Sequence, residues 1–283
     1  MKQLLILSGK GGTGKTTVAS SFIRLSQTKQ FADCDVEAPN LHLTQSFGQP
    51  TSKPYYGLDV AMINQDKCVG CGRCLDHCRF HAITNNGKFQ IDPYKCEGCH
   101  VCEIVCPQDA IDFHQNMSGS VDLYDEEKRF STGQLKMGSG NSGLLVTEVK
   151  RQLVNKVDLT IIDGPPGIGC PVIASMSGVD MVLVVTEPSL SGFSDMQRMV
   201  QTIQKARIPC AVCINKYDMN RDIAQRIQTY LVNQNISYVG KMAYSRDVSE
   251  WINRGIPVVL GDGKVSQQLK EIYHNVMNLI VKE

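Results

Sequence analysis

A glycine-rich segment near the start of the chain has the residue types that bind a nucleoside triphosphate. Residues 9–16 read Gly-Lys-Gly-Gly-Thr-Gly-Lys-Thr and fit the pattern G-x-x-x-x-G-K-[ST] between an apolar run and a helical pattern, a context that disfavours a chance glycine turn. In such a loop, backbone N–H groups surround the phosphates, Lys15 reaches the outer phosphates, and the Thr16 hydroxyl coordinates Mg²⁺. The sequence therefore predicts an ATP–Mg²⁺ site that comprises Gly9, Gly11, Gly12, Thr13, Gly14, Lys15, Thr16 and Thr17.

Eight cysteines in the middle of the chain are spaced for iron–sulfur chemistry. The pattern Cys-x2-Cys-x2-Cys-x3-Cys occurs twice, first at Cys68, Cys71, Cys74 and Cys78, and then at Cys96, Cys99, Cys102 and Cys106. In bacterial two-cluster ferredoxins with this spacing, three thiolates of one run and the last thiolate of the other hold one [4Fe-4S] cluster. We therefore predict one cluster on Cys68, Cys71, Cys74 and Cys106, and a second on Cys96, Cys99, Cys102 and Cys78.

Two features qualify the assignment of the metal. Cys-x2-Cys pairs also bind zinc, but four cysteines per run with a final x3 spacing favour iron–sulfur. Arg79 stands where the second run has Pro107, which affects the expected local geometry near Cys78 and not the number of clusters. The eight thiolates and two cores of about 2+ each would change the formal charge from +1 to about −3.

The composition limits the class of protein. The chain has 283 residues, and its 29 Lys and Arg nearly balance its 28 Asp and Glu, so we expect no nucleic-acid partner. No apolar stretch approaches the roughly 20 residues that span a bilayer. The N-terminal apolar run is too short for an export signal, and clustered cysteines indicate metal and not disulfides. We therefore expect a cytoplasmic protein.

Short apolar runs that alternate with helical patterns indicate the fold class. Strands are expected at residues 4–7, 159–162, 181–185 and 210–214, and helices after residue 142 and from about 191 to 206. Such strands imply a doubly wound, mostly parallel sheet of the P-loop α/β class, covered on both faces. Short strands are also expected within 118–135. The cysteine block is then a ferredoxin-like insertion, so that 1–63 and 115–283 form one discontinuous domain and 64–114 the other.

The remaining cysteines are interpreted as thiols without a metal. Cys210 and Cys213 lie in an apolar strand, where small buried thiols are expected. We also expect Cys34 and Cys170 to be buried, with contact to a dimer partner as the alternative for Cys170. The C-terminal apolar pattern predicts a helix packed on the sheet, because it lacks the basic face of a membrane-targeting helix.

Lys10, a second lysine within the loop, resembles the signature lysine of the deviant Walker A ATPases, the MinD/ParA class that includes the nitrogenase iron protein. In that class this lysine reaches the nucleotide of a dimer partner. Residues 33–41 resemble the first switch of the class, and 163–167 its Walker B aspartate and second switch. The resemblance implies that Asp35 positions the attacking water and that Asp33 lies near Mg²⁺. It also implies that Asp163 holds Mg²⁺ through water and that Asn215 contacts adenine.

The whole chain, including residues 135–138 and 142–146, resembles MinD-superfamily ATPases that contain an inserted ferredoxin domain. This resemblance implies a Mg²⁺-dependent ATPase that is slow without its partner. The protein would act as a homodimer, or as a heterodimer with a paralogue, and would meet a redox or metallocofactor protein. Three hypotheses follow: ATP-gated electron transfer, delivery of clusters or a metallocofactor as in Mrp-type relatives, and a positioning ATPase with structural or redox-sensing clusters.

Overall fold

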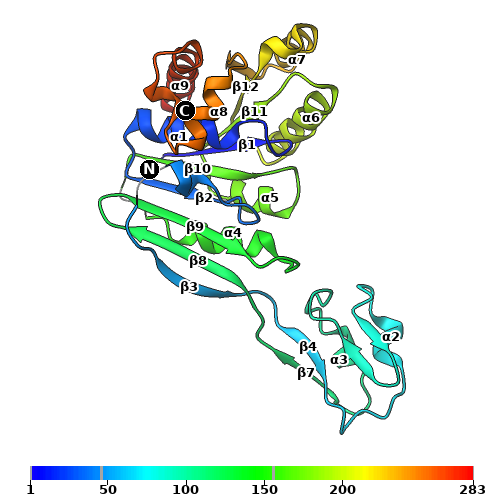
Figure 1. Ribbon diagram of the computed structural model, residues 1–283. Coiled ribbons are helices and arrows are strands. Elements are labelled where there is room, and N and C mark those ends of the chain that lie inside the picture. Colours follow the sequence, from blue (N-terminus) through cyan, green and yellow to red (C-terminus); the bar gives the residue numbers. More distant parts are fainter. Residues whose placement is uncertain (1, 45–46, 155–156, 283) are drawn as a thin grey trace.

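A computed structural model describes residues 2–44, 47–154 and 157–282. In these ranges a nine-stranded sheet has the order β13-β12-β11-β1-β10-β2-β9-β8-β3 (Figure 1). The strands are β1 Lys2–Ser8, β2 Gln30–Asp33, β3 Thr51–Tyr56, β8 Met117–Asp125, β9 Arg129–Leu135, β10 Leu159–Pro166, β11 Met181–Thr186, β12 Cys210–Ile214 and β13 Ser237–Lys241. The strands from β13 to β9 run parallel, and β8 and β3 are antiparallel at one edge. The expected mostly parallel sheet is therefore confirmed.

Helices cover both faces of this sheet. The helices α1 (Lys15–Ser26) and α9 (Lys264–Lys282) pack on one face. The other face carries α4 (Ser142–Arg151), α5 (Cys170–Met176), α6 (Leu190–Lys205) and α7 (Arg221–Asn233). Apolar strand residues point alternately into the two cores, since Leu5 and Leu7 join one cluster and Leu4 and Ile6 the other. This arrangement is the doubly wound fold that the alternating pattern predicts.

The strands at the sheet edge beyond β2 are longer than the sequence predicts. Residues 118–135, where only short strands were expected, form most of β8 and all of β9, with nine and seven residues. Residue β9 Phe130 is fully buried and stacks on Phe31 and Phe47, with ring centroids 5.1 and 4.8 Å apart. Aromatic packing across neighbouring strands thus fixes β9 against β2, and β9 in turn provides the edge on which β8 pairs.

The cysteine segment projects from this edge, between β3 and β8 (Figure 1). Its base is the antiparallel pair β4 (Val60–Ile63) and β7 (Ile111–His114). Beyond the base lie a second pair, β5 (Ile83–Asn85) with β6 (Phe89–Ile91), and the short helices α2 (Arg73–His77) and α3 (Val101–Ile104). Five buried apolar side chains form its separate core, namely Ala61, Ile63, Ile83, Phe89 and Ile111. The predicted boundary at residue 63 falls at the end of β4.

Three predictions about single elements have different outcomes. The C-terminal helix packs on the sheet as predicted, with Leu269, Ile272 and Val276 fully or almost fully buried. Cys34 and Cys213 are buried as expected, and Cys210 is partly exposed. The expectation for Cys170 is wrong, because Cys170 is exposed as the first residue of α5, whereas Val172 and Met176 of the same helix pack into the core.

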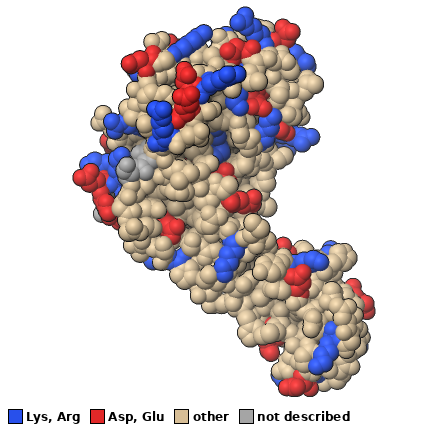
Figure 2. Space-filling model, in the orientation of Figure 1, with Lys and Arg blue, Asp and Glu red and all other residues tan. Residues whose placement is uncertain are grey.

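Charges of both signs are interspersed on the face shown in Figure 2, over the nucleotide-binding domain and the cysteine segment alike. Among the described residues, no helix is long and apolar enough to cross a membrane.

Two short 3₁₀ turns, η1 (Leu41–Thr44) and η3 (Val258–Leu260), and the helix α8 (Arg246–Asn253) complete the wall around the carboxyl end of β1, and η2 (Tyr217–Met219) follows β12.

The packing of Phe130 generates a stability prediction. Replacement of Phe130 by Ala should lower the free energy of unfolding by about 3–5 kcal/mol, because it leaves a cavity between the rings of Phe31, Phe47 and Tyr124. Urea titration followed by the fluorescence of Trp251, the single tryptophan, measures this change. Val232 on α7 is 74% exposed and provides the control, since Val232→Ala should change stability by no more than about 0.5 kcal/mol. Equal effects of the two substitutions would contradict the role of Phe130.

Candidate nucleotide site and cysteine centres

The phosphate-binding loop lies at the carboxyl end of the central strand β1 and leads directly into α1. Gly14, the residue before α1, has φ of 94°, a left-handed conformation that glycine adopts without strain. A Cβ atom at Gly14 would also collide with the side-chain amide of Asn215. Asn215 follows β12 and donates its Nδ2 hydrogen to the Thr13 carbonyl at 2.8 Å. Asn215, the residue predicted to contact adenine, thus also holds in place the loop that would bind the phosphates.

Lys15 lies among three carboxylates that the parallel strands bring together. Its Nζ is 2.9 Å from Asp163 Oδ1 and 3.8 Å from Asp35 Oδ2, and its side chain is almost completely buried. Burial alone lowers the pKa of Lys15, but the charges of Asp163, Asp33 and Asp35 outweigh it and raise the pKa overall. Lys15 is therefore a cation held by Asp163, which the resemblance assigns to Mg²⁺, and by Asp35, which it assigns to the attacking water.

Asp163 keeps one oxygen without a partner. Asp163 is fully buried at the carboxyl end of β10, and its Oδ2 atom has no hydrogen bond among the described residues. Thr16, the second residue of α1, follows Lys15, which contacts Asp163 Oδ1 at 2.9 Å. A buried, unpartnered carboxylate oxygen fits a hydrated Mg²⁺, which keeps several of its own waters and takes few protein ligands.

Asp33, which the resemblance places near Mg²⁺, is the register partner of Asp163 and is held by backbone N–H groups. Its carboxylate accepts three backbone N–H bonds, from Asp35 at 3.0 Å and from Asn40 and Leu41 at 2.9 Å each. Burial and the charge of Asp163 nevertheless raise the pKa of Asp33 to about 7. Asp33 therefore holds the backbone of the 33–41 segment, which includes Asp35, a partly exposed carboxylate 3.8 Å from Lys15 Nζ.

Lys10 is bound within its own chain. Its Nζ lies 2.6 Å from Glu187 Oε1 and donates to Ser189 Oγ and Ser191 Oγ at 3.3 and 3.2 Å. Burial alone would raise the pKa of Glu187, but Lys10 and Lys216 lower it overall. Glu187, Ser189 and Ser191 were not identified from the sequence, because nothing in the local pattern links them to residue 10.

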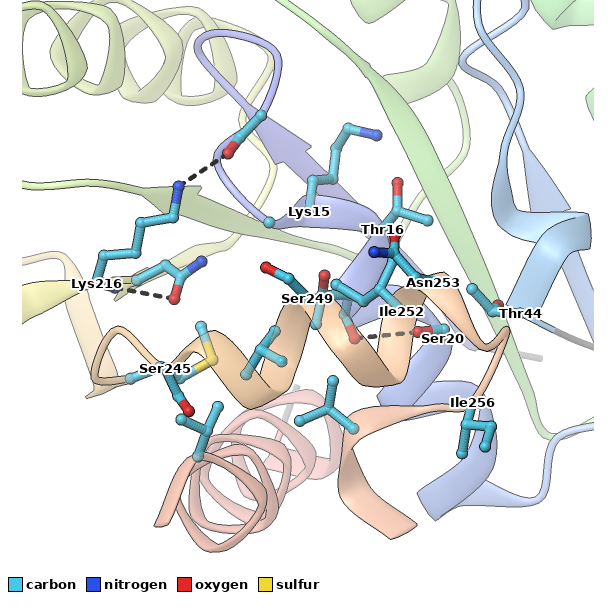
Figure 3. A pocket seen from close by; sticks show the side chains of 18 of the residues that line it. Lys15, Thr16, Ser20, Thr44, Lys216, Ser245, Ser249, Ile252, Asn253 and Ile256 are labelled. Atoms are coloured by element: carbon cyan, nitrogen blue, oxygen red, sulfur yellow. Dashed lines mark hydrogen bonds between the residues drawn. The ribbon is translucent and has the colours of Figure 1, made fainter. Parts of the chain in front are cut away.

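A cavity of about 820 Å³ opens beside the loop. Gly12, Lys15, Thr16, Asn215 and Lys216 line one side of it. Figure 3 shows Ser249, Ile252 and Asn253 of α8 opposite Thr16 and Ser20 of α1. The α8 residues were not predicted, although Val248, Trp251 and Ile252 recur at helical spacing, which indicates a helix with one apolar face.

The structure groups the eight cysteines around two small cavities. One cavity is lined by Cys68, Cys71, Cys74 and Cys106, and the other by Cys78, Cys96, Cys99 and Cys102. Each group takes its fourth member from the other run, which is the grouping that the spacing predicts. Within the described residues, no three His, Cys, Asp or Glu side chains are placed to share a single metal ion.

The surroundings of the cysteines suit thiolate-bound clusters. The backbone N–H of Ala61 donates to Cys96 Sγ and that of Ala110 to Cys106 Sγ, both at 3.4 Å. Such N–H···S bonds stabilise the negative charge of a metal-bound sulfur. Burial raises the pKa of the Cys102 thiol to about 11, so binding of a cluster must release protons. Assembly of the predicted clusters should therefore become easier as pH rises.

Fold and site together define a P-loop nucleotide-binding protein that carries a ferredoxin-like insert. Residues 4–258 match the family described as CobQ/CobB/MinD/ParA nucleotide binding domain, and the chain belongs to this family. It is 33% identical over 285 residues to the uncharacterized protein MJ0578 of Methanocaldococcus jannaschii, which covers 98% of this chain and 97% of that protein.

Three further similarities cover the chain or its insert. An iron-sulfur cluster carrier protein of Pyrococcus abyssi is 22% identical, with 98% of this chain and 85% of that protein aligned. Ferredoxin-3 of a Nostoc species is 30% identical over 83 residues, 22% of this chain and 82% of that protein. The septum site-determining protein MinD of Pyrococcus horikoshii, solved with Mg-ADP, superposes with a TM-score of 0.59 at 18% identity, over 98% and 96% of the chains. This last likeness shows the fold.

The buried Lys15–Asp163 pair generates the second prediction. In the nucleotide-free protein, Lys15→Met should lower the free energy of unfolding by about 3–5 kcal/mol, because it leaves buried carboxylates without their cation. The double variant Lys15→Met with Asp163→Asn should lose less than the sum of the two single variants. Urea titrations of all four proteins measure the coupling. Additive losses would show that the pair is not coupled in the folded protein.

Proposed function

We propose that the protein is an ATP-hydrolysing iron–sulfur protein in which nucleotide state gates electron transfer through two [4Fe-4S] clusters to a protein partner. The observation that carries this proposal is the presence, in one chain, of a phosphate-binding loop with its aspartates and of two four-cysteine cavities with crossed ligand sets. We propose a division into an ATPase domain, 1–63 and 115–283, and a ferredoxin domain, 64–114, with the boundary strand β4 pairing with β7 of the ferredoxin domain.

In the nucleotide site, the loop amides and Lys15 would bind the phosphates of ATP. Thr16 and Asp163 would hold Mg²⁺, which neutralises phosphate charge, and Asn215 would contact the base. Asp35 would orient a water that attacks the γ-phosphorus, so that the bond to the bridging oxygen of ADP breaks and the water proton leaves with the phosphate. Because Lys15 now binds Asp163 and Asp35, ATP must compete with these aspartates for it. This competition supports slow hydrolysis of ATP in the absence of a partner. It also links the binding of ATP to both switch segments, because Asp35 and Asp163 belong to them.

We also propose that the ATP-bound protein dimerises, with another copy or with a paralogue. By the family resemblance, Lys10 would then reach the partner's nucleotide. Its contacts with Glu187, Ser189 and Ser191 hold it in its own chain while no partner is present. Release of Lys10 is therefore part of the cost of dimerisation, and the phosphate charge of the second nucleotide offsets that cost.

A second candidate function is delivery of clusters to another protein. The relatives named iron-sulfur cluster carrier proteins, which align with nearly the whole chain, favour it. The crossed ligand sets favour electron transfer, because release of one cluster would have to break bonds from both cysteine runs. The two functions differ in whether iron leaves the protein when ATP is supplied.

The crossed ligand sets generate a prediction about iron content. Anaerobically reconstituted protein should hold about eight irons per chain, four in each cluster. The pair Cys68→Ser with Cys106→Ser should keep about four, because both substitutions fall in one ligand set. The matched pair Cys68→Ser with Cys78→Ser should lose both clusters, since it affects both sets. Iron and sulfide assays with EPR of the reduced proteins measure this; the reverse ranking would contradict the grouping.

The gating proposal predicts an effect of ATP on reduction. Redox titration of the two-cluster protein followed by EPR should show that Mg·ATP shifts the midpoint potential of at least one cluster, and about 60 mV corresponds to a tenfold change in equilibrium. Mg·ATP should not shift it in Lys15→Met, which lacks the phosphate-binding lysine. If ATP changes neither the potentials nor the rate of electron delivery, gating is wrong. ATP-dependent loss of iron to an apo-ferredoxin would instead support delivery.

A further inference from the structure

The loop 136–141, between β9 and α4, lies between the first switch segment, the start of α5 and the cysteine segment. At its start, the backbone N–H of Leu135 donates to the Val36 carbonyl at 2.8 Å, and Val36 follows Asp35 directly. At its end, Gly143 lies against the backbone of Cys170, since a Cβ at Gly143 would be 3.3 Å from the Cys170 carbonyl carbon. Helix α5, which begins at Cys170, follows the strand that carries Asp163.

The middle of the 136–141 loop faces the cysteine segment. A Cβ at Gly140 would lie 3.4 Å from Glu97 Oε1 and 3.6 Å from Glu97 Oε2, and one at Gly138 would lie 3.3 Å from the Tyr94 ring. Glu97 stands between Cys96 and Gly98 and lines the cavity of Cys78, Cys96, Cys99 and Cys102. Neither Glu97 nor Tyr94 lines the cavity of the other four cysteines.

The loop can move because it is held mainly at its ends. Its Met137 side chain is 97% exposed, so displacement of the loop uncovers little buried apolar surface. Lys15 has two alternative sets of anionic partners, namely Asp163 and Asp35 in this structure and the phosphates of a bound nucleotide. Transfer of Lys15 between them changes the charge balance in both switch segments. The residues that flank the loop contact the first switch at Val36 and the start of α5, three residues after the second switch.

We propose that the 136–141 loop transmits nucleotide state to the cysteine set Cys78, Cys96, Cys99 and Cys102, with Glu97 as the positioning residue at the contact. The other cysteine set lies beyond this contact. The two centres thus have different roles: one senses the nucleotide, and the other serves exchange of electrons with the partner. This inference rests on the proposed function and names the route by which its gating would act.

Amide hydrogen exchange of the two-cluster protein, with and without Mg·ATP, tests the route. ATP should slow exchange several-fold in peptides that cover 92–100 and 136–145, and leave the peptide 66–76 unchanged. Trp251 fluorescence reports nucleotide binding, and iron content reports the clusters, on the same samples. If ATP or iron does not bind, the proposed function fails; if both bind and 92–100 does not respond, only the route through the loop is wrong.

Substitutions at Gly140 give matched variants, because its backbone does not adopt the left-handed conformation. Gly140→Asp places a second carboxylate against Glu97 and should abolish the response of 92–100, while 136–145 still responds. Gly140→Asn has the same shape without the charge and should keep both responses. Adding Glu97→Gln to Gly140→Asp should restore the response of 92–100. Identical behaviour of the Asp and Asn variants, or an equal response of 66–76 to ATP, would overturn the proposal.

Discussion

The burial of Lys15 among Asp33, Asp35 and Asp163 is the constraint on which the rest of the site depends. Parallel strands end at one edge of the sheet, so three carboxylates from β2, β10 and the segment after β2 converge, and one lysine offsets part of their charge. Such a cluster is stable only with a cation in its centre. The same cluster is therefore incomplete when phosphates draw the lysine away, which explains why Mg²⁺ and ATP are expected to bind together.

Local sequence patterns were sufficient to predict single strands, the loop at residues 9–16 and the grouping of the cysteines. The apolar run of β11 is buried along its whole length, and the loop at residues 9–16 needs only its own glycines and the helix after it. Cysteine spacing is equally local, since one short loop presents three thiols to one cavity. The ligand roles of these residues remain predictions, although the structure places Lys15, Asp35 and Asp163 together and groups the cysteines as expected.

Contacts between distant segments could not be predicted from one sequence. The partners of Lys10 are about 180 positions away in the chain, at the start of α6, and no periodicity connects them. The wall formed by α8 depends on how the chain returns after β13. The buried position expected for Cys170 was also wrong, because its side chain is exposed although Val172, two positions later in α5, is buried.

The core of the cysteine segment has a consequence for how the protein comes into being. Five buried apolar side chains are too few to keep about fifty residues folded by themselves. Cluster assembly and folding of this segment are then one event, because each cluster cross-links both halves of it. The sheet has two extensive apolar cores of its own, so its folding should not require metal. When iron is limiting, the chain would thus combine a formed sheet with an unformed cysteine segment, and the ratio of the two forms would report iron supply.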